Sequence, residues 1–187
     1  MADLRLRTFG GVQIEGPAGA AATQRRRLAF LSILAASDAG TTREQLVGLL
    51  WPDSSEEKAK HALAQLLYSV RREFSEEVVQ ADSVTLRLNT AILPTDVSEF
   101  RLAIAKGDLE RAASLHTGPF LDGFYLTGCP EFERWADETR ALLVDMARGA
   151  LEKLATSAER AANAGEAVEW SRRLVRLSPL DGRRRCA

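Results

Sequence analysis

The sequence of 187 residues is poor in several features, and each shortage argues against a class of protein. Its two cysteines, Cys129 and Cys186, lie far apart and without ligand spacing around them, so we expect neither a disulfide framework nor a zinc site. No apolar run approaches the roughly 18 residues of a membrane span, and the N-terminus lacks a signal-peptide pattern. These absences predict a cytoplasmic protein that does not enter a membrane.

Sequence motifs of catalysis are also missing. We find no G-x-S-x-G, no glycine-rich phosphate loop and no H-E-x-x-H. The two histidines, His61 and His116, are isolated, and acid pairs such as Glu56 and Glu57 lie at predicted helix ends, where solvation explains them. We therefore expect a protein that is not an enzyme and that uses no cofactor and no metal.

The sequence has no large excess of either charge, because it contains 25 basic and 26 acidic residues. Any signal for nucleic acid must therefore be local, and residues 57–74, EKAKHALAQLLYSVRREF, carry one. Helical periodicity gathers apolar side chains on one face of this segment. The other face has no acid from Lys58 to Arg72, and it displays Lys58, Lys60, His61, Gln65, Tyr68, Arg71 and Arg72.

The elements around this segment follow a recognisable order. Alternating residues at 4–14 predict two short strands, and helices are predicted at 23–37, 41–51 and 55–74. Capping boxes are expected at Thr42 with Gln45, or Thr41 with Glu44, and at Ser54 with Glu57. A hairpin at 78–88, turning at residues 80–83, follows the basic helix. This order is typical of a winged helix-turn-helix.

The residues from Pro94 onward show no strand pattern. Two short helices flank Gly107, a loop rich in glycine and aromatic residues covers 118–130, and residues 131–165 predict a long helix and then a second one. A spacing of small and apolar residues similar to a tetratricopeptide unit follows, at Ala161, Gly165, Ala167, Leu174, Leu177 and Pro179. We expect the nearby aromatic residues to be core rather than a ligand site: Trp51, Phe124, Tyr125, Phe132 and Trp135.

Taken together, LLWPD at 49–53, FLDGFYL at 120–126 and EFERWADE at 131–138 resemble the antibiotic regulatory protein (SARP) type of bacterial transcriptional activator. The resemblance implies a mainly α protein with small β elements. An OmpR-like winged helix at 1–93 would precede an all-α, tetratricopeptide-like bacterial transcriptional activation domain at 94–187. It also implies an activator that binds direct repeats in double-stranded promoter DNA as a homodimer and contacts RNA polymerase.

The sequence departs from this family in two ways. The activation domain of the family usually continues through more helical repeats, so this chain is expected to be either a fragment or a form whose last repeat is covered by something else. Lys60 and His61 also stand where the family tends to have an arginine and a small polar residue. The base preference of the family therefore does not transfer to this chain.

The candidate DNA contacts on the basic helix divide by chemistry. Lysine and arginine can pair with guanine and glutamine with adenine, so we expect base contacts from Lys60, Gln65, Tyr68 and Arg71. Lys58 and Arg72 are expected to contact phosphates, and His61 either a base or a phosphate. Further contacts are expected from the start of the first helix, the start of the second and the wing, at Arg26, Arg27, Thr42, Arg43 and Arg87.

For most of these residues a solvated surface position is nearly as good an interpretation, and Thr42 can serve only as a helix cap. The competing function is a helical-repeat adaptor whose N-terminal domain binds protein instead of DNA. A nearly neutral net charge is compatible with that alternative.

Overall fold

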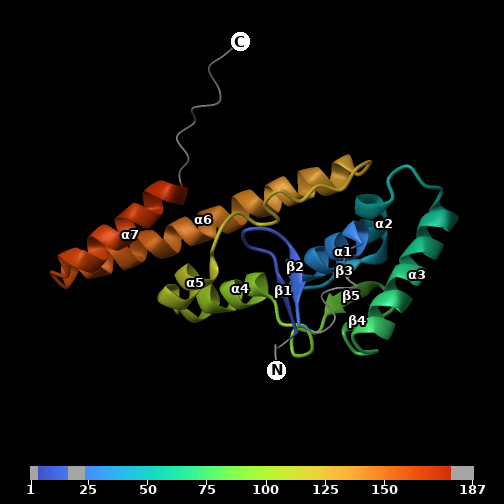
Figure 1. Cartoon of the computed structure of the whole chain (residues 1–187), viewed down its shortest axis with the longest axis horizontal. Helices are drawn as coiled ribbons and strands as arrows, with labels where there is room; N and C mark the ends of the chain where they lie inside the picture. Colours follow the sequence, from blue (N-terminus) through green and yellow to red (C-terminus); the bar gives the residue numbers. More distant parts are fainter. Residues whose placement is uncertain (1–3, 17–23, 178–187) are drawn as a thin grey trace, which may run out of the picture.

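The computed structural model describes residues 4–16 and 24–177. Seven helices and five short strands are found in this part of the chain (Figure 1). They are β1 (Arg5–Arg7), β2 (Gln13–Glu15), α1 (Arg25–Ala35), β3 (Thr41–Thr42), α2 (Arg43–Leu50), α3 (Glu56–Glu73), β4 (Val79–Ala81), β5 (Thr85–Leu88), α4 (Asp96–Lys106), α5 (Leu109–Leu115), α6 (Pro130–Arg160) and α7 (Ala164–Leu177). The expectation of a mainly α fold with small β elements is confirmed.

The alternating pattern predicts the two N-terminal strands, β1 and β2, and in the structure they form an antiparallel hairpin. Leu6 pairs with Ile14, and both side chains are buried because alternate residues of a strand face the same side. Only β3 is missing from the sequence prediction. Its two residues pair with β5, Thr41 opposite Leu86, and complete a small sheet in the order β3-β5-β4.

Helix starts agree only in part with the predicted caps. Thr42 forms the expected capping box, since its hydroxyl accepts from the backbone N–H of Gln45 at 3.1 Å and the Gln45 side chain accepts from Thr42 N at 3.1 Å. The box predicted at Ser54 and Glu57 is wrong. The residue before α3 is Ser55, and its side chain makes no capping hydrogen bond.

The C-terminal helices correct a second prediction. Residues 131–165 were expected to hold two helices, but α6 runs unbroken for 31 residues, since no proline interrupts it after Pro130. The chain reverses at Ala161–Asn163, where Ala162 adopts φ +56°. Buried Ala158 and Ala167 let α6 and α7 pack closely. Of the small residues in the tetratricopeptide-like spacing, only Ala167 is buried, and Ala161 and Gly165 are exposed. Pro179 lies outside the described residues.

The hydrophobic core is continuous from Leu6 to Ala147 and crosses the predicted boundary at residues 93 and 94. The placing of that boundary stays a prediction. Phe124 and Phe132 are buried and Trp51 and Trp135 pack against the core, as expected. Tyr125 is the exception among the predicted core aromatics, because 65% of its surface is exposed. Among the described helices, none combines the length and the apolar character that a membrane crossing requires.

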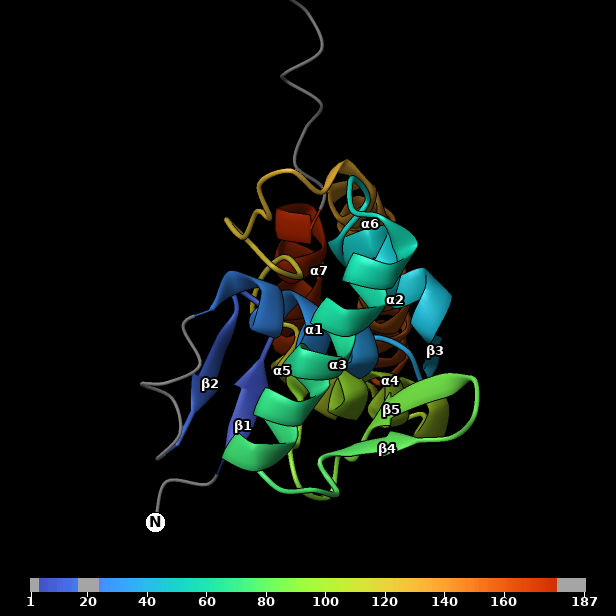
Figure 2. The same cartoon turned by 90° about the vertical axis from the view of Figure 1, so that its right-hand side faces the viewer.

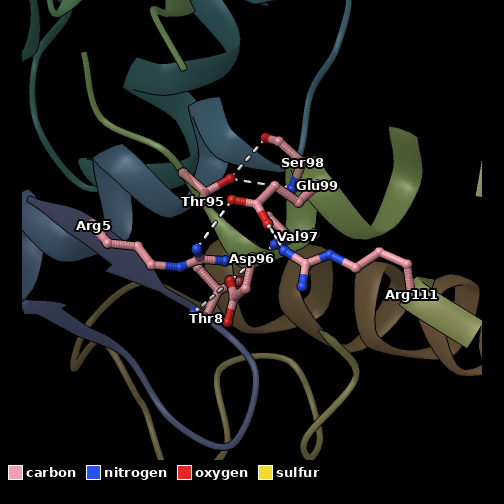
Figure 3. Close-up of polar contacts among 8 residues, drawn as sticks. All are labelled: Arg5, Thr8, Thr95, Asp96, Val97, Ser98, Glu99 and Arg111. Atoms are coloured by element: carbon pink, nitrogen blue, oxygen red, sulfur yellow. Dashed lines mark hydrogen bonds and ion pairs between the residues drawn. The ribbon is translucent and has the colours of Figure 1, made fainter. Parts of the chain in front are cut away.

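A buried carboxylate joins the N-terminal hairpin to the helices that follow (Figure 3). Asp96, at the start of α4, is 5% exposed and accepts hydrogen bonds from the backbone N–H groups of Thr8, Phe9 and Val97, all at 2.8–2.9 Å. The Thr8 hydroxyl donates a further bond at 2.6 Å. A buried carboxylate is tolerated where several donors satisfy it, and its position at a helix N-terminus adds a favourable dipole.

Ion pairs surround this carboxylate and connect the same elements. Glu99, one turn along α4, lies 3.0 Å from Arg5 of β1 and 2.9 Å from Arg111 of α5 (Figure 3). In addition, Leu6 N donates to Pro94 O at 2.9 Å. The first strand, α4 and α5 are thus held together by polar contacts as well as by the shared core.

We expect Asp96→Asn to lower the free energy of unfolding by about 2–4 kcal/mol, because the amide NH2 would face backbone donors that now meet a carboxylate oxygen. Urea denaturation followed by circular dichroism measures the change. Asp108→Asn is the matched control, since Asp108 is an exposed N-cap and asparagine caps equally well. Equal effects of the two substitutions would contradict the role given to Asp96.

Candidate nucleic-acid interface

Helix α3 separates apolar and polar residues as its sequence predicts. Ala59, Leu63, Leu66 and Val70 are buried at helical spacing. Figure 2 looks onto the opposite face of the helix, which lies in front of α1 and α2, with the β4–β5 hairpin beside it. The structure thus presents α3 and the hairpin on the same side of the molecule.

Six of the predicted contacts are on the exposed face of α3, which we call the α3 face. They are Lys58, Lys60, His61, Gln65, Tyr68 and Arg72. Tyr68 is 65% exposed, which is unusual for a large ring and leaves it available for stacking. The Gln65 side chain lies 2.8 Å from Nε2 of His61, so these two polar side chains are coupled one turn apart.

Lys60 has one partner on the α3 face, Glu56 at i−4. This carboxylate raises the pKa of the Lys60 ammonium through a hydrogen bond and through charge attraction. Both side chains are largely exposed, and an exposed pair of this kind contributes little free energy. The ammonium therefore stays charged and can exchange Glu56 for another anion at small cost.

Arg71 does not lie on the α3 face with the others. Its guanidinium is half-buried and donates to the carbonyl of Val79 at 2.8 Å, which fastens the end of α3 to the start of β4. A base contact from Arg71 would require this hydrogen bond to break. The structure therefore places Arg71 in a supporting position behind the hairpin.

The expected contact from Arg27 conflicts with its burial, and we withdraw it. The residue is 7% exposed and forms an ion pair with Glu73 of α3, with Ser69 also in reach of the guanidinium at 3.4 Å. A phosphate has no access to a guanidinium held in this way. The pair instead joins α1 to the last turn of α3.

Arg26 lies at the junction of α1, α2 and α6. It donates to the carbonyl of Leu50 at 3.0 Å, and its guanidinium covers the ring of Trp51 at 5.7 Å. The Cys129 thiol donates to the same carbonyl at 3.3 Å. A cation is favourable at the C-terminal end of a helix, so Arg26 completes the end of α2 rather than extending the α3 face.

The predicted contacts around the wing make hydrogen bonds to backbone groups of neighbouring elements. Arg43 N donates to Val84 O at 3.2 Å, and the Arg43 guanidinium lies 3.4 Å from the carbonyl of Asp82. Arg87 is exposed, but its Nε donates to Ala39 O at 3.0 Å. Thr42 serves as the cap of α2. These residues orient the wing relative to α2, and Arg43 and Arg87 keep part of their charge near its edge.

Sequence reasoning missed the residue that shapes the wing. Asp82 accepts bonds from Val84 N at 2.8 Å, Thr85 N at 2.6 Å and the Thr85 hydroxyl at 2.6 Å. The side-chain bond from Thr85, with backbone bonds from Thr85 and Val84, lowers the pKa of Asp82 to about 2. An aspartate three residues before a threonine in a predicted turn was the available signal, because aspartate often bonds the backbone just ahead of it.

Within residues 4–16 and 24–177, no group of three or more His, Cys, Asp or Glu side chains is placed to hold a metal ion. The chemistry that the α3 face offers comes from its own side chains. It combines positive charge, amide and imidazole groups and an exposed aromatic ring.

No protein-family model matches the sequence, and no curated protein matches it significantly. Among solved structures, the chain is similar to EmbR of Mycobacterium tuberculosis in complex with a low-affinity phosphopeptide. The TM-score is 0.51 at 16% sequence identity, and the match covers 97% of this chain and 67% of that chain. At this identity the similarity supports a common fold, with α-helices and small winged β elements.

The Asp82 turn gives a pH prediction. Because the pKa of Asp82 is lowered from 3.8 to about 2, its contribution to the hairpin is complete above pH 3.8 and is lost as the pH falls toward 2. Thr85→Val removes the largest cause and should return the pKa toward 3.8, as a carboxyl NMR titration would measure. Ser83→Ala is the control. An Asp82 pKa that stays near 2 in Thr85→Val would contradict this assignment.

Proposed function

We propose that this protein is a transcription regulator that binds double-stranded DNA in a sequence-specific way through α3. The observation that carries the proposal is the α3 face, which has no acid between Lys58 and Arg72 and lies beside the β4–β5 hairpin. A helix of this kind fits the major groove, where its side chains reach base edges while flanking cations hold the phosphates.

The similarity in fold to EmbR is compatible with this proposal, since the two chains share a mainly α fold with small winged β elements. From the sequence resemblance we further infer an activator that binds direct repeats as a homodimer and contacts RNA polymerase. The helical part from α4 to α7 is the natural candidate for those protein contacts, because it lies away from the α3 face (Figure 1).

Within the proposed complex the side chains divide their roles. Lys60, Gln65 and Tyr68, in the middle of α3, read base edges, with His61 holding the Gln65 amide in place. Lys58 and Arg72 at the two ends of the α3 face bind phosphates, and Arg43 and Arg87 add charge beside the wing. Arg71 acts indirectly, by fixing the hairpin against α3.

A second candidate, a helical adaptor that binds protein, is favoured by one observation. The outer face of α7 exposes apolar side chains, with Val168 at 48% and Val175 at 73% exposure. Apolar residues grouped on a surface helix are a feature of protein contacts. An adaptor would show no affinity for DNA, whereas a regulator of the proposed kind uses both surfaces.

DNA binding is tested by fluorescence anisotropy with a labelled pool of upstream DNA at two salt concentrations. If four cations each neutralise one phosphate, log affinity should fall with log salt at a slope of about −3.6. Saturable binding, a steep salt slope and enrichment of a direct repeat are the expected results. A folded protein that shows no binding at low salt would overturn the proposal and favour the adaptor.

Lys60→Ala should weaken binding to the enriched repeat by about 1–3 kcal/mol and relax sequence preference at one position, because it removes a base contact. Lys153→Ala is the matched control, since Lys153 is exposed on α6, away from the α3 face. Arg72→Ala should weaken all sequences alike and reduce the salt slope by about one. Equal effects of Lys60→Ala and Lys153→Ala would contradict the proposal that α3 reads the DNA sequence.

A further inference from the structure

A groove lies where α5 and α7 both pack on α6, away from the α3 face (Figure 1). Its volume is about 1000 Å³. One wall is the end of α5 with the loop from His116 to Pro119, and the other is formed by the last turns of α7. None of the DNA contacts proposed above lines it.

The floor of the groove is apolar and elongated. It is formed by small and branched side chains of α6 and α7, which are Ala141, Val144, Ala147, Leu151 and Leu177. The lining residues of α6 extend from Asp137 to Leu151, which is about 21 Å at the helical rise of 1.5 Å per residue. A floor of this shape suits a chain or a flat ring system better than a compact polar molecule.

The rim of the groove is positive. Four arginines line it, Arg140, Arg148, Arg173 and Arg176, against the single carboxylate of Asp137. Arg140 pairs with Asp137, Arg148 pairs with Asp145 at 2.8 Å, and Arg173 donates to the carbonyl of Ala113 at 2.5 Å. Arg176 is exposed and has no hydrogen bond or ion pair within the described part of the chain. The lining therefore holds positive charge that its own acids do not balance.

One residue of the groove lining also carries a polar atom without a partner. His116 lines it, and its Nε2 is buried and has no hydrogen-bond partner among residues 4–16 and 24–177. The ring packs against Phe9 and Phe100, at centroid distances of 4.8 and 5.9 Å. Burial lowers the pKa of His116 and the nearby charge of Arg173 lowers it further, against a backbone hydrogen bond and the charge of Asp96, which raise it. A buried polar atom of this kind calls for a hydrogen-bonding partner.

We propose that this groove binds a small amphipathic anion, with an apolar chain or ring system along α6 and a carboxylate at the arginine rim. The volume lies at the upper end of the range for small-molecule sites, which are mostly apolar with a few placed polar groups. Charge complementarity selects an anion over a neutral or cationic ligand. The apolar floor argues against nucleic acid, which would present phosphates and not apolar surface to α6.

The test is isothermal titration calorimetry of the whole chain with three probes that share one apolar chain: decanoate, decanol and decyltrimethylammonium. Decanoate should bind saturably to one site with a Kd below about 1 mM. Decanol should bind several-fold more weakly, and the cation more weakly still, because each partly exposed charge contact is worth only about two- to five-fold in affinity.

Two pairs of variants locate the site. Ala141→Phe fills the groove from an exposed position and should abolish saturable decanoate binding, whereas Leu142→Phe enlarges a neighbouring exposed residue that does not line the groove. Arg176→Gln should weaken decanoate binding about three-fold, and Arg172→Gln, which removes the same charge from a residue of α7 that does not line the groove, should leave it unchanged. Circular dichroism verifies that each variant is folded.

Three results would overturn the proposal. Decanoate that shows no saturable binding up to about 1 mM leaves no anion site of useful affinity. Decanol binding as tightly as decanoate identifies an apolar surface, suited to a protein partner instead of an anion. Binding that survives Ala141→Phe, or that Arg172→Gln weakens as much as Arg176→Gln, places the ligand elsewhere. If Ala141→Phe does not fold, the arginine pair decides alone.

Discussion

The carboxylate of Asp96 is the contact on which the arrangement of this protein depends. It is buried, and four donors from Thr8, Phe9 and Val97 converge on it, from two segments 88 residues apart in the chain. The turn after β1 is therefore fixed on the start of α4, and Glu99 strengthens the junction by pairing with Arg5 and Arg111. The junction depends on all of these hydrogen bonds, since a buried carboxylate is stable only where its hydrogen bonds are made.

Around that junction, the core extends without a break from the N-terminal hairpin to α6. The Arg27–Glu73 pair and the Arg71 bond to Val79 fix α3 between α1 and the wing. The position of the α3 face thus depends on contacts made by charged side chains that do not lie on it. Removing these supports would displace the α3 face, although none of them lies on it.

Much of the fold could be predicted from the sequence because its signals are local. Helical spacing identified the buried and exposed faces of α3, and alternation placed Leu6 and Ile14 on one side of two strands, which the structure pairs. Strand β3 was missed because two residues have no period, and it exists only through pairing with β5. Periodicity also placed Arg71 on an exposed face, but the partner that draws it inward, Val79, lies in the next element. The groove has no sequence signal, since three helices form it together.

Helix α6 has a mechanical consequence. Its 31 residues make a rod of about 46 Å. Its first turns adjoin the end of α2, where Cys129 and Arg26 share the Leu50 carbonyl, its middle turns line the groove, and its far end leads into α7. A rod converts a small rotation at one end into a larger displacement at the other. A tilt of about 5° about the α2 end moves the α7 end by roughly 4 Å, close to the rise of three helical residues.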